Sequence, residues 1–275
     1  MYLITGSNGQ LGHELTARIP GAIATDADTL DITDFDAVQN FVRANNIDTI
    51  INCAAYTAVD RAESDVDTAT RVNVTGPENL AKTGCKLVHI STDYVFDGTA
   101  HIPYKTTDEP NPTSIYGKTK LAGERAVLKN NNTAIIIRTA WLYSPNGNNF
   151  VKTMLRLGAE RESVNVVCDQ IGTPTYAGDL ADAILKILPQ ISTETAGIYH
   201  YTNAGVCSWY DFATAIMQCG GRNCHVNAIP TSEYPTAATR PYYSVLDKEK
   251  IKKTFNLEIP HWYDGLRRCM EKMPK

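Results

Sequence analysis

The feature that most constrains the fold is a glycine-rich turn between a short apolar strand and a helix at the start of the chain. Residues 2–5 read Tyr-Leu-Ile-Thr, and the segment 6–12 that follows reads Gly-Ser-Asn-Gly-Gln-Leu-Gly. Glycines let the backbone approach a pyrophosphate closely, and the N-terminus of the next helix stabilises its negative charge. In this context the turn predicts a dinucleotide-binding fold, with Gly6, Gly9 and Gly12 beside the phosphates.

Strands and helices alternate along the first half of the chain. After the first strand, apolar strands are expected at residues 22–25, 48–52, 86–90 and 133–138. A long helix is expected from about residue 64 to 83. This alternation predicts an α/β protein with a doubly wound parallel sheet of Rossmann type. Later in the chain, strands and helices alternate less regularly. We therefore expect a dinucleotide-binding domain over residues 1–145 and a smaller C-terminal substrate-binding lobe over residues 146–275, interleaved with the sheet.

Composition narrows the range of partners and compartments. The net charge of −4 and a pI of about 5.9 give no reason to expect nucleic acid, although a nucleotide-sized ligand needs only a local site. Seven scattered cysteines without CxxC pairs favour reduced thiols and a cytoplasmic protein, and no complete set of metal ligands stands out. No apolar run reaches the ~18 residues of a membrane-spanning helix. The early glycine turn leaves no room for a cleavable signal.

A tyrosine and a lysine four residues apart form the central candidate for chemistry. Tyr116 and Lys120 fall where a helical pattern begins, so they would project from one face of that helix. An ammonium beside a phenol lowers the pKa of the tyrosine toward the working pH, which suits proton transfer. Thr92, at the tip of the fourth strand, could donate a hydrogen bond to a substrate carbonyl oxygen. A helix-capping role for Thr92 would require a helix directly after it.

Four further side chains have a functional and a structural interpretation. Asp26 lies twenty residues beyond Gly6, where an acid would bond the adenosine ribose, and it favours NAD because no Arg or Lys stands nearby. Asp31 could touch the adenine or cap the next helix. Trp141 could stack on a sugar or base, or pack inside the protein. Arg240 could clamp a phosphate or form a surface salt bridge.

Taken together, these motifs resemble the extended short-chain dehydrogenase/reductases, in which the G-x-x-G-x-x-G spacing is a known variant, and within them the dTDP-4-dehydrorhamnose reductase family. The segments that carry the likeness are residues 6–12, 30–33, 52–63, 91–98, 116–124, 169–175 and 240–247. The resemblance implies hydride transfer from NADPH or NADH to the 4-keto carbon of dTDP-4-dehydro-β-L-rhamnose, which gives dTDP-L-rhamnose, the last step of activated rhamnose synthesis.

The resemblance also implies roles for individual residues. Tyr116 matches the proton donor, Lys120 the residue that lowers its pKa and holds the nicotinamide ribose, and Thr92 the residue that bonds the reacting oxygen. Asp93 and Trp141 match sugar-contacting positions, and Arg240 is a further candidate for the substrate. The cofactor wall is matched by Gln10, Leu11, Asp26, Asp31, Ile32, Ala54, Ala55 and Tyr56.

Metal content and assembly stay open at this point. Some members of the family dimerise around a magnesium ion held by glutamates. Glu14 sits at a plausible first position, but the end of the chain, Met270-Glu271-Lys272, gives no acid that aligns with a second. The sequence therefore does not support Mg²⁺ here, and it leaves both a monomer and a homodimer possible.

Rival functions share much of this pattern. A nucleotide-sugar 4,6-dehydratase or epimerase would keep NAD bound, but Tyr94 stands where the dehydratases place a glutamate. Residues 91–94 also lack the cysteine of the epimerase-reductases of fucose synthesis. A non-catalytic NADP-binding subunit, like the regulatory subunit of methionine adenosyltransferase, is the third alternative, and the complete set of Thr92, Tyr116 and Lys120 weighs against it. The choice between NADH and NADPH, and the nucleotide and stereochemistry of the sugar, stay undecided.

Overall fold

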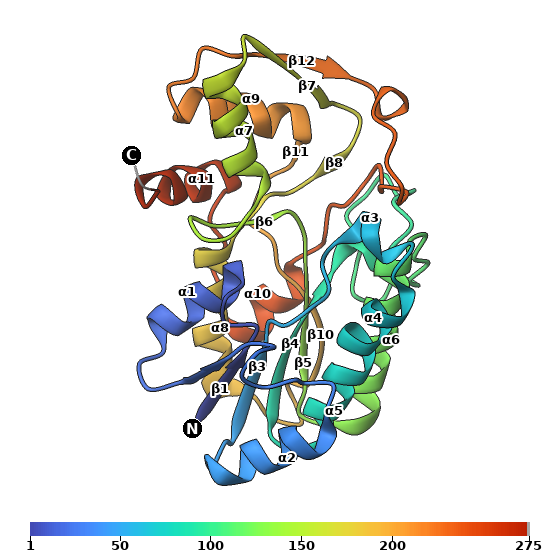
Figure 1. Ribbon diagram of the computed structural model, residues 1–275, viewed down its shortest axis with the longest axis vertical. Coiled ribbons are helices and arrows are strands. Elements are labelled where there is room, and N and C mark those ends of the chain that lie inside the picture. The colour runs from blue at the N-terminus through green and yellow to red at the C-terminus, as the bar shows by residue number, and fades with distance from the viewer. Residues whose placement is uncertain (274–275) are drawn as a thin grey trace.

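The computed structural model describes residues 1–273, and its larger lobe is built on a six-stranded parallel sheet (Figure 1). The strand order is β10-β5-β4-β3-β1-β2, and each neighbouring pair is parallel. The strands are β1 (Tyr2–Thr5), β2 (Ile23–Thr25), β3 (Thr49–Asn52), β4 (Lys86–Thr92), β5 (Ile135–Thr139) and β10 (Gly197–His200). The predicted doubly wound α/β fold is confirmed.

Helices cover both faces of this sheet. One face packs against α1 (Gln10–Arg18), α8 (Ala177–Ile187) and α10 (Glu249–Phe255), and the other against α2 (Phe35–Ala44), α5 (Gly76–Lys82) and α6 (Ile115–Asn130). Successive strand residues point to opposite faces, so Leu3 packs on the α2 side and Ile4 on the α1 side. Strands buried on both faces read as continuous apolar runs, which is the pattern seen here.

Polar residues mark where the helices begin. Asp34 accepts a hydrogen bond from the Ala37 N–H at the start of α2, and Ser114 accepts one from the Gly117 N–H at the start of α6. Each side chain satisfies a backbone donor that the first helical turn leaves free. The cap at Ser114 fixes the first turn of α6, which carries Tyr116.

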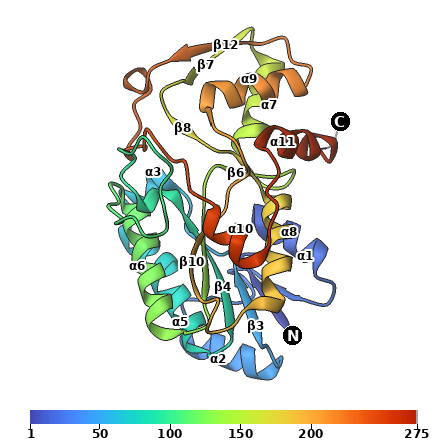
Figure 2. The same cartoon turned by 180° about the vertical axis from the view of Figure 1, so that it is seen from behind.

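A smaller lobe lies beyond the carboxyl ends of the strands, as the view from behind also shows (Figure 2). Its main elements are α7 (Phe150–Glu160), β7 (Ser163–Val167), α9 (Trp209–Cys219), β12 (His225–Ile229) and α11 (Trp262–Glu271). Its short strands are β6 (Leu142–Tyr143), β8 (Ile171–Gly172), β9 (Thr175–Tyr176) and β11 (Cys207–Ser208). Its core centres on aromatic side chains around Phe212.

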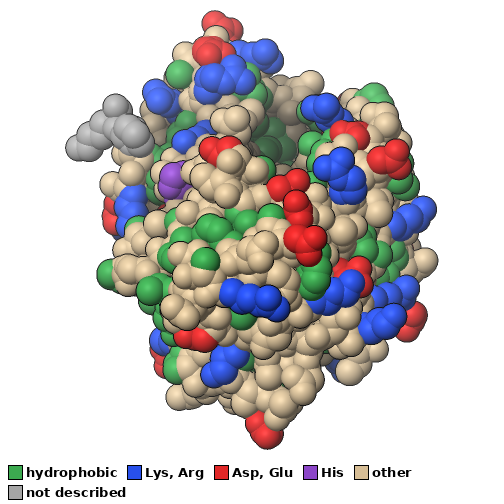
Figure 3. Space-filling view, turned by 60° about the horizontal axis from the view of Figure 1, so that its bottom comes forward, with side chains coloured by type: hydrophobic (Ala, Val, Ile, Leu, Met, Phe, Trp, Pro, Cys, Tyr) green, Lys and Arg blue, Asp and Glu red, His purple; other side chains and the backbone are tan. Residues whose placement is uncertain are grey.

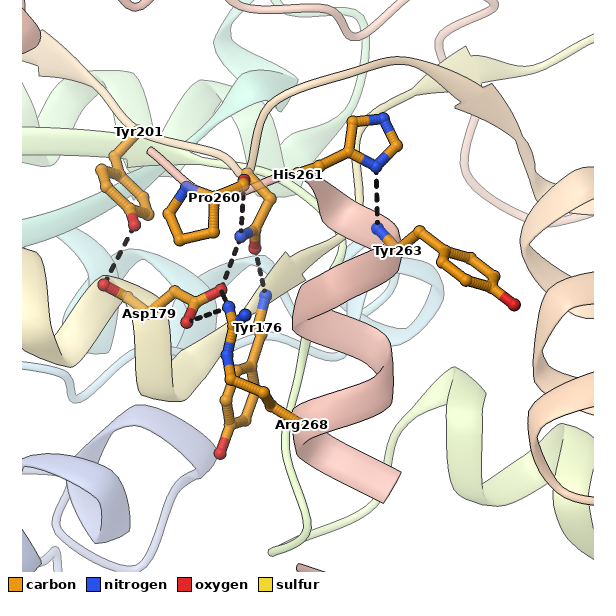
Figure 4. Close-up of polar contacts among 8 residues, drawn as sticks. Tyr176, Asp179, Tyr201, Pro260, His261, Tyr263 and Arg268 are labelled. Atoms are coloured by element: carbon orange, nitrogen blue, oxygen red, sulfur yellow. Dashed lines mark hydrogen bonds and ion pairs between the residues drawn. The ribbon is translucent and has the colours of Figure 1, made fainter. Parts of the chain in front are cut away.

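The two lobes are tied together by a buried carboxylate at the start of α8. Asp179 accepts hydrogen bonds from Arg268 of α11 at 2.7 Å and from the Asn203 side-chain nitrogen at 2.6 Å. The Tyr201 hydroxyl donates to the Asp179 backbone oxygen (Figure 4). Elements from both lobes therefore meet at one polar cluster.

The predicted division into residues 1–145 and 146–275 stays a prediction, and the last two of those residues lie outside the described range. Three elements from beyond residue 145, namely α8, β10 and α10, pack on or within the sheet.

The long helix expected over residues 64–83 is confirmed as an unbroken helical run, made of α4 (Val66–Thr70), a π-helical turn at Arg71–Thr75 and α5. A separate short helix, α3 (Val59–Ala62), precedes it. Within the π-helical turn, the buried Asn73 bonds both backbone polar groups of Tyr56 and donates to the Thr119 hydroxyl of α6. A π-helical turn contains one extra residue compared with an α-helical turn. In this turn Asn73 contacts Tyr56 in the loop that follows β3.

Two observations concern the surface and the membrane. On the face drawn in Figure 3, lysine and arginine side chains are interspersed with aspartate and glutamate, and neither sign forms a broad patch. Across residues 1–273, no helix is both long and apolar enough to span a bilayer.

Candidate active site

One cavity of about 750 Å³ lies where the carboxyl ends of the strands meet the smaller lobe. Thr5 at the end of β1, Cys53 after β3, Thr92 at the end of β4 and Thr139 at the end of β5 all line it. This is the crevice in which open parallel sheets bind ligands. Its volume falls in the range of ligand sites, about 300–1,000 Å³.

The glycine turn forms one wall of this cavity, and its geometry admits only glycine at two positions. Gly6 has φ +66°, and a Cβ there would lie 2.6 Å from the Ala54 backbone nitrogen. A Cβ on Gly12 would lie 2.3 Å from the Gly6 carbonyl oxygen. Glycine at these positions therefore lets the turn pack closely against the backbone at Ala54 and at its own first residue, and the N-terminus of α1 follows directly after it.

Most of the predicted cofactor wall lines the same cavity. The residues that do so are Gly6, Gly9, Gln10, Leu11, Gly12, Asp26, Asp31, Ile32, Ala54 and Ala55. The Asp26 carboxylate accepts a hydrogen bond from the Asn8 N–H at 2.9 Å, which holds it beside the glycine turn. Asp31 accepts from the Thr33 N–H, whereas Asp34 caps α2, so the capping interpretation of Asp31 is wrong.

Tyr56 departs from this pattern. Its side chain is not part of the cavity lining, and its hydroxyl donates to Asp65 at 3.1 Å. Its backbone is held by Asn73. The resemblance placed Tyr56 on the cofactor wall, but the structure turns its side chain toward α4.

The three predicted catalytic residues meet in this cavity. Tyr116 and Lys120 come from the first two turns of α6, and Thr92 comes from the neighbouring tip of β4. Helix α6 approaches closely because Gly117 faces the Tyr94 carbonyl oxygen, only 2.2 Å from where a Cβ would be. The Lys120 ammonium donates a hydrogen bond to the Ile90 carbonyl oxygen at 2.7 Å.

The pKa of the tyrosine is shifted in the direction opposite to the one expected. Burial raises the pKa of Tyr116, and a hydrogen bond with Thr92 opposes the shift only in part. Burial lowers the pKa of Lys120 to about 8, while the nearby Glu124 acts the other way. The expectation that Lys120 lowers the tyrosine pKa is wrong for this structure, because removal from water dominates the phenol and the ammonium is bonded to a backbone carbonyl.

Thr92 both caps and faces the cavity. A short 3₁₀ helix, Asp93–Val95, follows it directly, and the Thr92 hydroxyl oxygen accepts from the Tyr94 N–H at 3.2 Å. The helix that a capping role for Thr92 requires is therefore present, and that role stands beside the cavity-facing one. The Thr92 hydroxyl donates to Asp93 at 3.0 Å, and the other Asp93 oxygen is buried without a hydrogen-bond partner within residues 1–273. Burial raises the pKa of Asp93 to about 6.

Trp141 is packed against a second tryptophan and also borders the cavity, so its packing role is confirmed, and stacking on a sugar or base stays a prediction. Its indole lines the cavity and also stacks on Trp209, with ring centroids 3.6 Å apart and an interplanar angle of 14°. Its φ of +49° is rare for a residue with a side chain. Gly172 lies against the indole, where a Cβ would come within 2.7 Å. The strained backbone and the stack hold the ring in one orientation.

Arg240 lies outside the cavity lining. Its guanidinium forms an ion pair with Asp60 at 2.5 Å, which is the salt-bridge alternative. It also lies beside Tyr94, whose pKa is raised to about 12 by burial, with Arg240 opposing the shift. A contact between Arg240 and a phosphate stays a prediction.

Several cavity residues were not foreseen. Tyr94 lines the cavity and packs edge-on against the Tyr116 ring, with centroids 5.5 Å apart. Asn149, the cap of α7, donates to the Gln10 side chain at 3.1 Å and so joins the glycine turn to the smaller lobe. Cys53 is also in the wall, and burial raises the pKa of its thiol to about 12. The only advance signal for Asn149 was its place before a helix, which does not reveal a cavity.

A buried ion pair lies directly behind the catalytic strand tip. The Arg138 guanidinium donates to both carboxylate oxygens of Glu124, at 2.9 and 2.7 Å, and the Ser91 hydroxyl donates to the same carboxylate at 2.5 Å. Glu124 is one turn of α6 after Lys120, and Arg138 pairs in register with Ser91. The pair therefore fixes α6 against β4 and β5 next to Thr92.

The glutamate considered for magnesium is engaged elsewhere. Glu14 forms an ion pair with Arg18, which also bonds Asp182 at 2.7 Å. In the part of the chain that the structure describes, no three His, Cys, Asp or Glu side chains gather as a metal site would need.

A parallel sheet with a glycine turn after β1, and a Tyr-x-x-x-Lys pair beside a strand-tip threonine, define a nucleotide-dependent oxidoreductase of the extended short-chain dehydrogenase/reductase type. The family model for the RmlD substrate binding domain matches residues 1–274. The chain therefore belongs to the RmlD substrate binding domain family.

Similar proteins agree with this assignment. A dTDP-4-dehydrorhamnose reductase from Aggregatibacter actinomycetemcomitans is 44% identical over 283 residues, and the match covers 96% of each chain. The spore coat polysaccharide biosynthesis protein SpsK of Bacillus subtilis is 39% identical and covers 98% of this chain and 96% of its own. A crystal structure of the Bacillus anthracis dTDP-4-dehydrorhamnose reductase in complex with NADP superposes with a TM-score of 0.95 at 42% identity, over 99% of both chains.

Proposed function

We propose that this chain uses NADPH or NADH to reduce the 4-keto group of dTDP-4-dehydro-β-L-rhamnose, giving dTDP-L-rhamnose. The observation that carries the proposal is the convergence of Tyr116, Lys120 and Thr92 on the cavity that the glycine turn also lines. Family membership supports the substrate class. The partner is thus a dTDP-sugar, and we infer a cytoplasmic enzyme that works as a monomer or homodimer.

The cavity has the chemistry that a nicotinamide dinucleotide requires. Gly6, Gly9 and Gly12 would lie beside the pyrophosphate, and the backbone N–H groups at the start of α1 would donate hydrogen bonds to it. The turn keeps this shape only with glycine, because a Cβ at Gly6 or Gly12 would collide with backbone atoms. Asp26 would accept from the adenosine ribose, and Lys120 would donate to the nicotinamide ribose. When bound, the cofactor supplies the hydride.

The role of the protein side chains is to stabilise charge on the ketone oxygen and to deliver a proton. Reduction develops alkoxide charge on that oxygen, so hydrogen-bond donors aimed at it lower the barrier. Tyr116 is protonated at neutral pH because burial raises its pKa, which is the state a proton donor needs. Burial lowers the pKa of Lys120 to about 8, so its ammonium is still cationic near pH 7 and available to hold the cofactor ribose.

The remaining substrate contacts follow from the cavity wall. The exposed edge of the Trp141 stack would pack against the apolar face of the sugar, and Asp93 would accept from a sugar hydroxyl. To contact the diphosphate of the substrate, Arg240 would have to bind that diphosphate and Asp60 with the same guanidinium.

The test is the consumption of NADPH in the presence of the keto-sugar nucleotide. Tyr116→Phe removes the transferable proton, and we expect its rate to fall by about a hundredfold to ten-thousandfold. Tyr234→Phe, which changes an exposed tyrosine outside the cavity, is the matched control and should keep the wild-type rate. Equal rates for wild type and Tyr116→Phe would remove Tyr116 from the mechanism.

The same assay separates the rival functions. A dehydratase or epimerase returns its hydride and consumes no NADPH during turnover. A regulatory subunit would bind NADP without turning over any keto-sugar. Stoichiometric loss of NADPH with formation of the 4-hydroxyl sugar is expected only of the reductase.

A further inference from the structure

The hydroxyl of Thr92 has a single proton to donate, and its position directs that proton at Asp93. Thr92 Oγ1 lies 3.0 Å from Asp93 Oδ1, and the same oxygen accepts from the Tyr94 N–H at 3.2 Å. A hydroxyl offers one donor and two acceptor sites. The Tyr116 hydroxyl also lies within reach of Thr92. While Asp93 is a carboxylate, it is the strongest acceptor beside Thr92 and competes with a ketone oxygen for the single Thr92 proton.

The surroundings of Asp93 disfavour its charge. The side chain is 4% exposed, and its Oδ2 atom forms no hydrogen bond with any described residue. The titratable groups around it are Tyr94 on the 3₁₀ helix and Tyr116 on α6, both neutral phenols. The nearest cation on the facing loop, Arg240, is paired with Asp60 of α3, and the Ser244 hydroxyl opposes the effect of burial only in part.

We propose that Asp93 works in its protonated form, donating through Oδ1 to the Thr92 oxygen and so turning the Thr92 proton toward the reacting carbonyl oxygen. This inference rests on the proposed reductase function and adds a positioning role for Asp93. Asp93 keeps its proton throughout, and the proton added to the alkoxide comes from Tyr116. The hydrogen-bond chain runs from Asp93 through Thr92 to the substrate.

The consequence is a rate that falls as pH rises. When Asp93 ionises, Thr92 must break a charge-assisted hydrogen bond before it can stabilise the alkoxide, so turnover continues at a lower level. The pKa of Asp93, about 6, places the change in the accessible pH range.

The variant Asp93→Asn distinguishes the proposed positioning role of Asp93 from a purely structural role. In Asp93→Asn the side chain keeps its shape and a donor for Thr92 but cannot titrate, whereas Asp93→Ala keeps neither. We expect the kcat of wild type, at saturating NADPH and keto-sugar, to fall about tenfold between about pH 5 and about pH 8. The kcat of Asp93→Asn should lack this fall and exceed that of Asp93→Ala about tenfold at about pH 8. NADPH binding checks that both variants fold.

Two results would overturn the proposal. The first is the same pH-dependent fall in Asp93→Asn as in wild type, because the titrating group would then lie elsewhere. The second is an Asp93→Asn rate no higher than that of Asp93→Ala, because a donor at position 93 would then be irrelevant.

A spectroscopic titration tests the same idea without turnover, so it stays informative even if the keto-sugar is not the substrate. The carboxylic acid stretching band of Asp93 should appear in infrared difference spectra between wild type and Asp93→Asn as the pH is lowered through about 6. It should shift in frequency in Thr92→Val, which removes the acceptor. Absence of the band throughout the range would contradict the proposal, whereas failure of wild type to consume NADPH would count against the proposed function alone.

Discussion

Two buried carboxylates lie on either side of the tip of β4, and their surroundings differ sharply. Glu124, 1% exposed, accepts two hydrogen bonds from Arg138 and one from Ser91. Asp93, 4% exposed, accepts one from the Thr92 hydroxyl and lies beside the Ser244 hydroxyl, and within residues 1–273 its second oxygen has no hydrogen-bond partner. The first carboxylate lies behind the cavity, and the second forms part of its wall.

The comparison shows that this fold buries one carboxylate in a structural ion pair and another in the wall of the cavity. A buried carboxylate is stabilised by a counter-charge and by hydrogen bonds, and Glu124 has both. Asp93 lacks a counter-charge, so burial shifts its pKa upward toward neutrality. A group held near its titration point can change a neighbouring hydrogen bond, whereas a fully paired group can only fix its elements in place.

Breaking the pair behind the cavity should have the largest effect on stability. Glu124→Gln leaves Arg138 charged, buried and without its counter-ion, and we expect a loss of about 3–5 kcal/mol in the free energy of unfolding. Denaturant titration measures it. The double variant Glu124→Met, Arg138→Met should lose clearly less, because it buries no unpaired charge. Equal losses in the single and double variants would mean that packing, and not charge, is responsible.

Neutralising the carboxylate in the wall should stabilise the protein. The pKa of Asp93 rises from an ordinary 3.8 to about 6 on folding, so the stability contributed by its protonated form is complete below pH 3.8 and is lost as pH rises through about 6. Asp93→Asn should therefore be about 3 kcal/mol more stable than wild type at about pH 8, with the gain vanishing at about pH 3. Thermal unfolding across this pH range provides the measurement. A gain independent of pH would contradict the assigned pKa shift.

A surface carboxylate gives the reference point and the smallest effect. Glu160 pairs with Arg156 at 3.0 Å on α7, with the side chains 52% and 60% exposed. Water screens such a pair, so Glu160→Gln should change the free energy of unfolding by about 0.5 kcal/mol or less. The same denaturant titration applies, and a change above about 1 kcal/mol would weaken the argument that burial separates the other two.

Much of the sheet lobe could be predicted from local pattern. The turn at residues 6–12, the apolar runs of β1 to β5 and the cap at Asp34 are readable because each depends on a few adjacent residues. The π-helical turn around Asn73 could not be predicted from local pattern, and Asn73 there bonds Thr119, forty-six residues away, a contact that only the fold creates. The place of strand β10 beside β5 is set only by the fold, because the two strands lie about sixty residues apart in the chain.

The candidate site, like the fold, could be predicted from the sequence only in part. That Tyr116, Lys120 and Thr92 would share one cavity followed from a motif and from strand order, and the structure brings them together. The direction of the Tyr116 pKa shift did not follow, because burial is a property of the whole packed lobe. The orientation of Tyr56 away from the cavity and the pairing of Arg240 with Asp60 likewise depend on distant partners.

The sequence by itself determined the parallel α/β sheet, the glycine turn and the identities of the groups available for chemistry, since these depend on periodicity and on neighbouring residues. Only the tertiary structure decided how those groups are desolvated and hydrogen-bonded. Their partners come from segments far apart in the chain, so that Glu124 is paired with Arg138, while one Asp93 oxygen has no hydrogen-bond partner among residues 1–273.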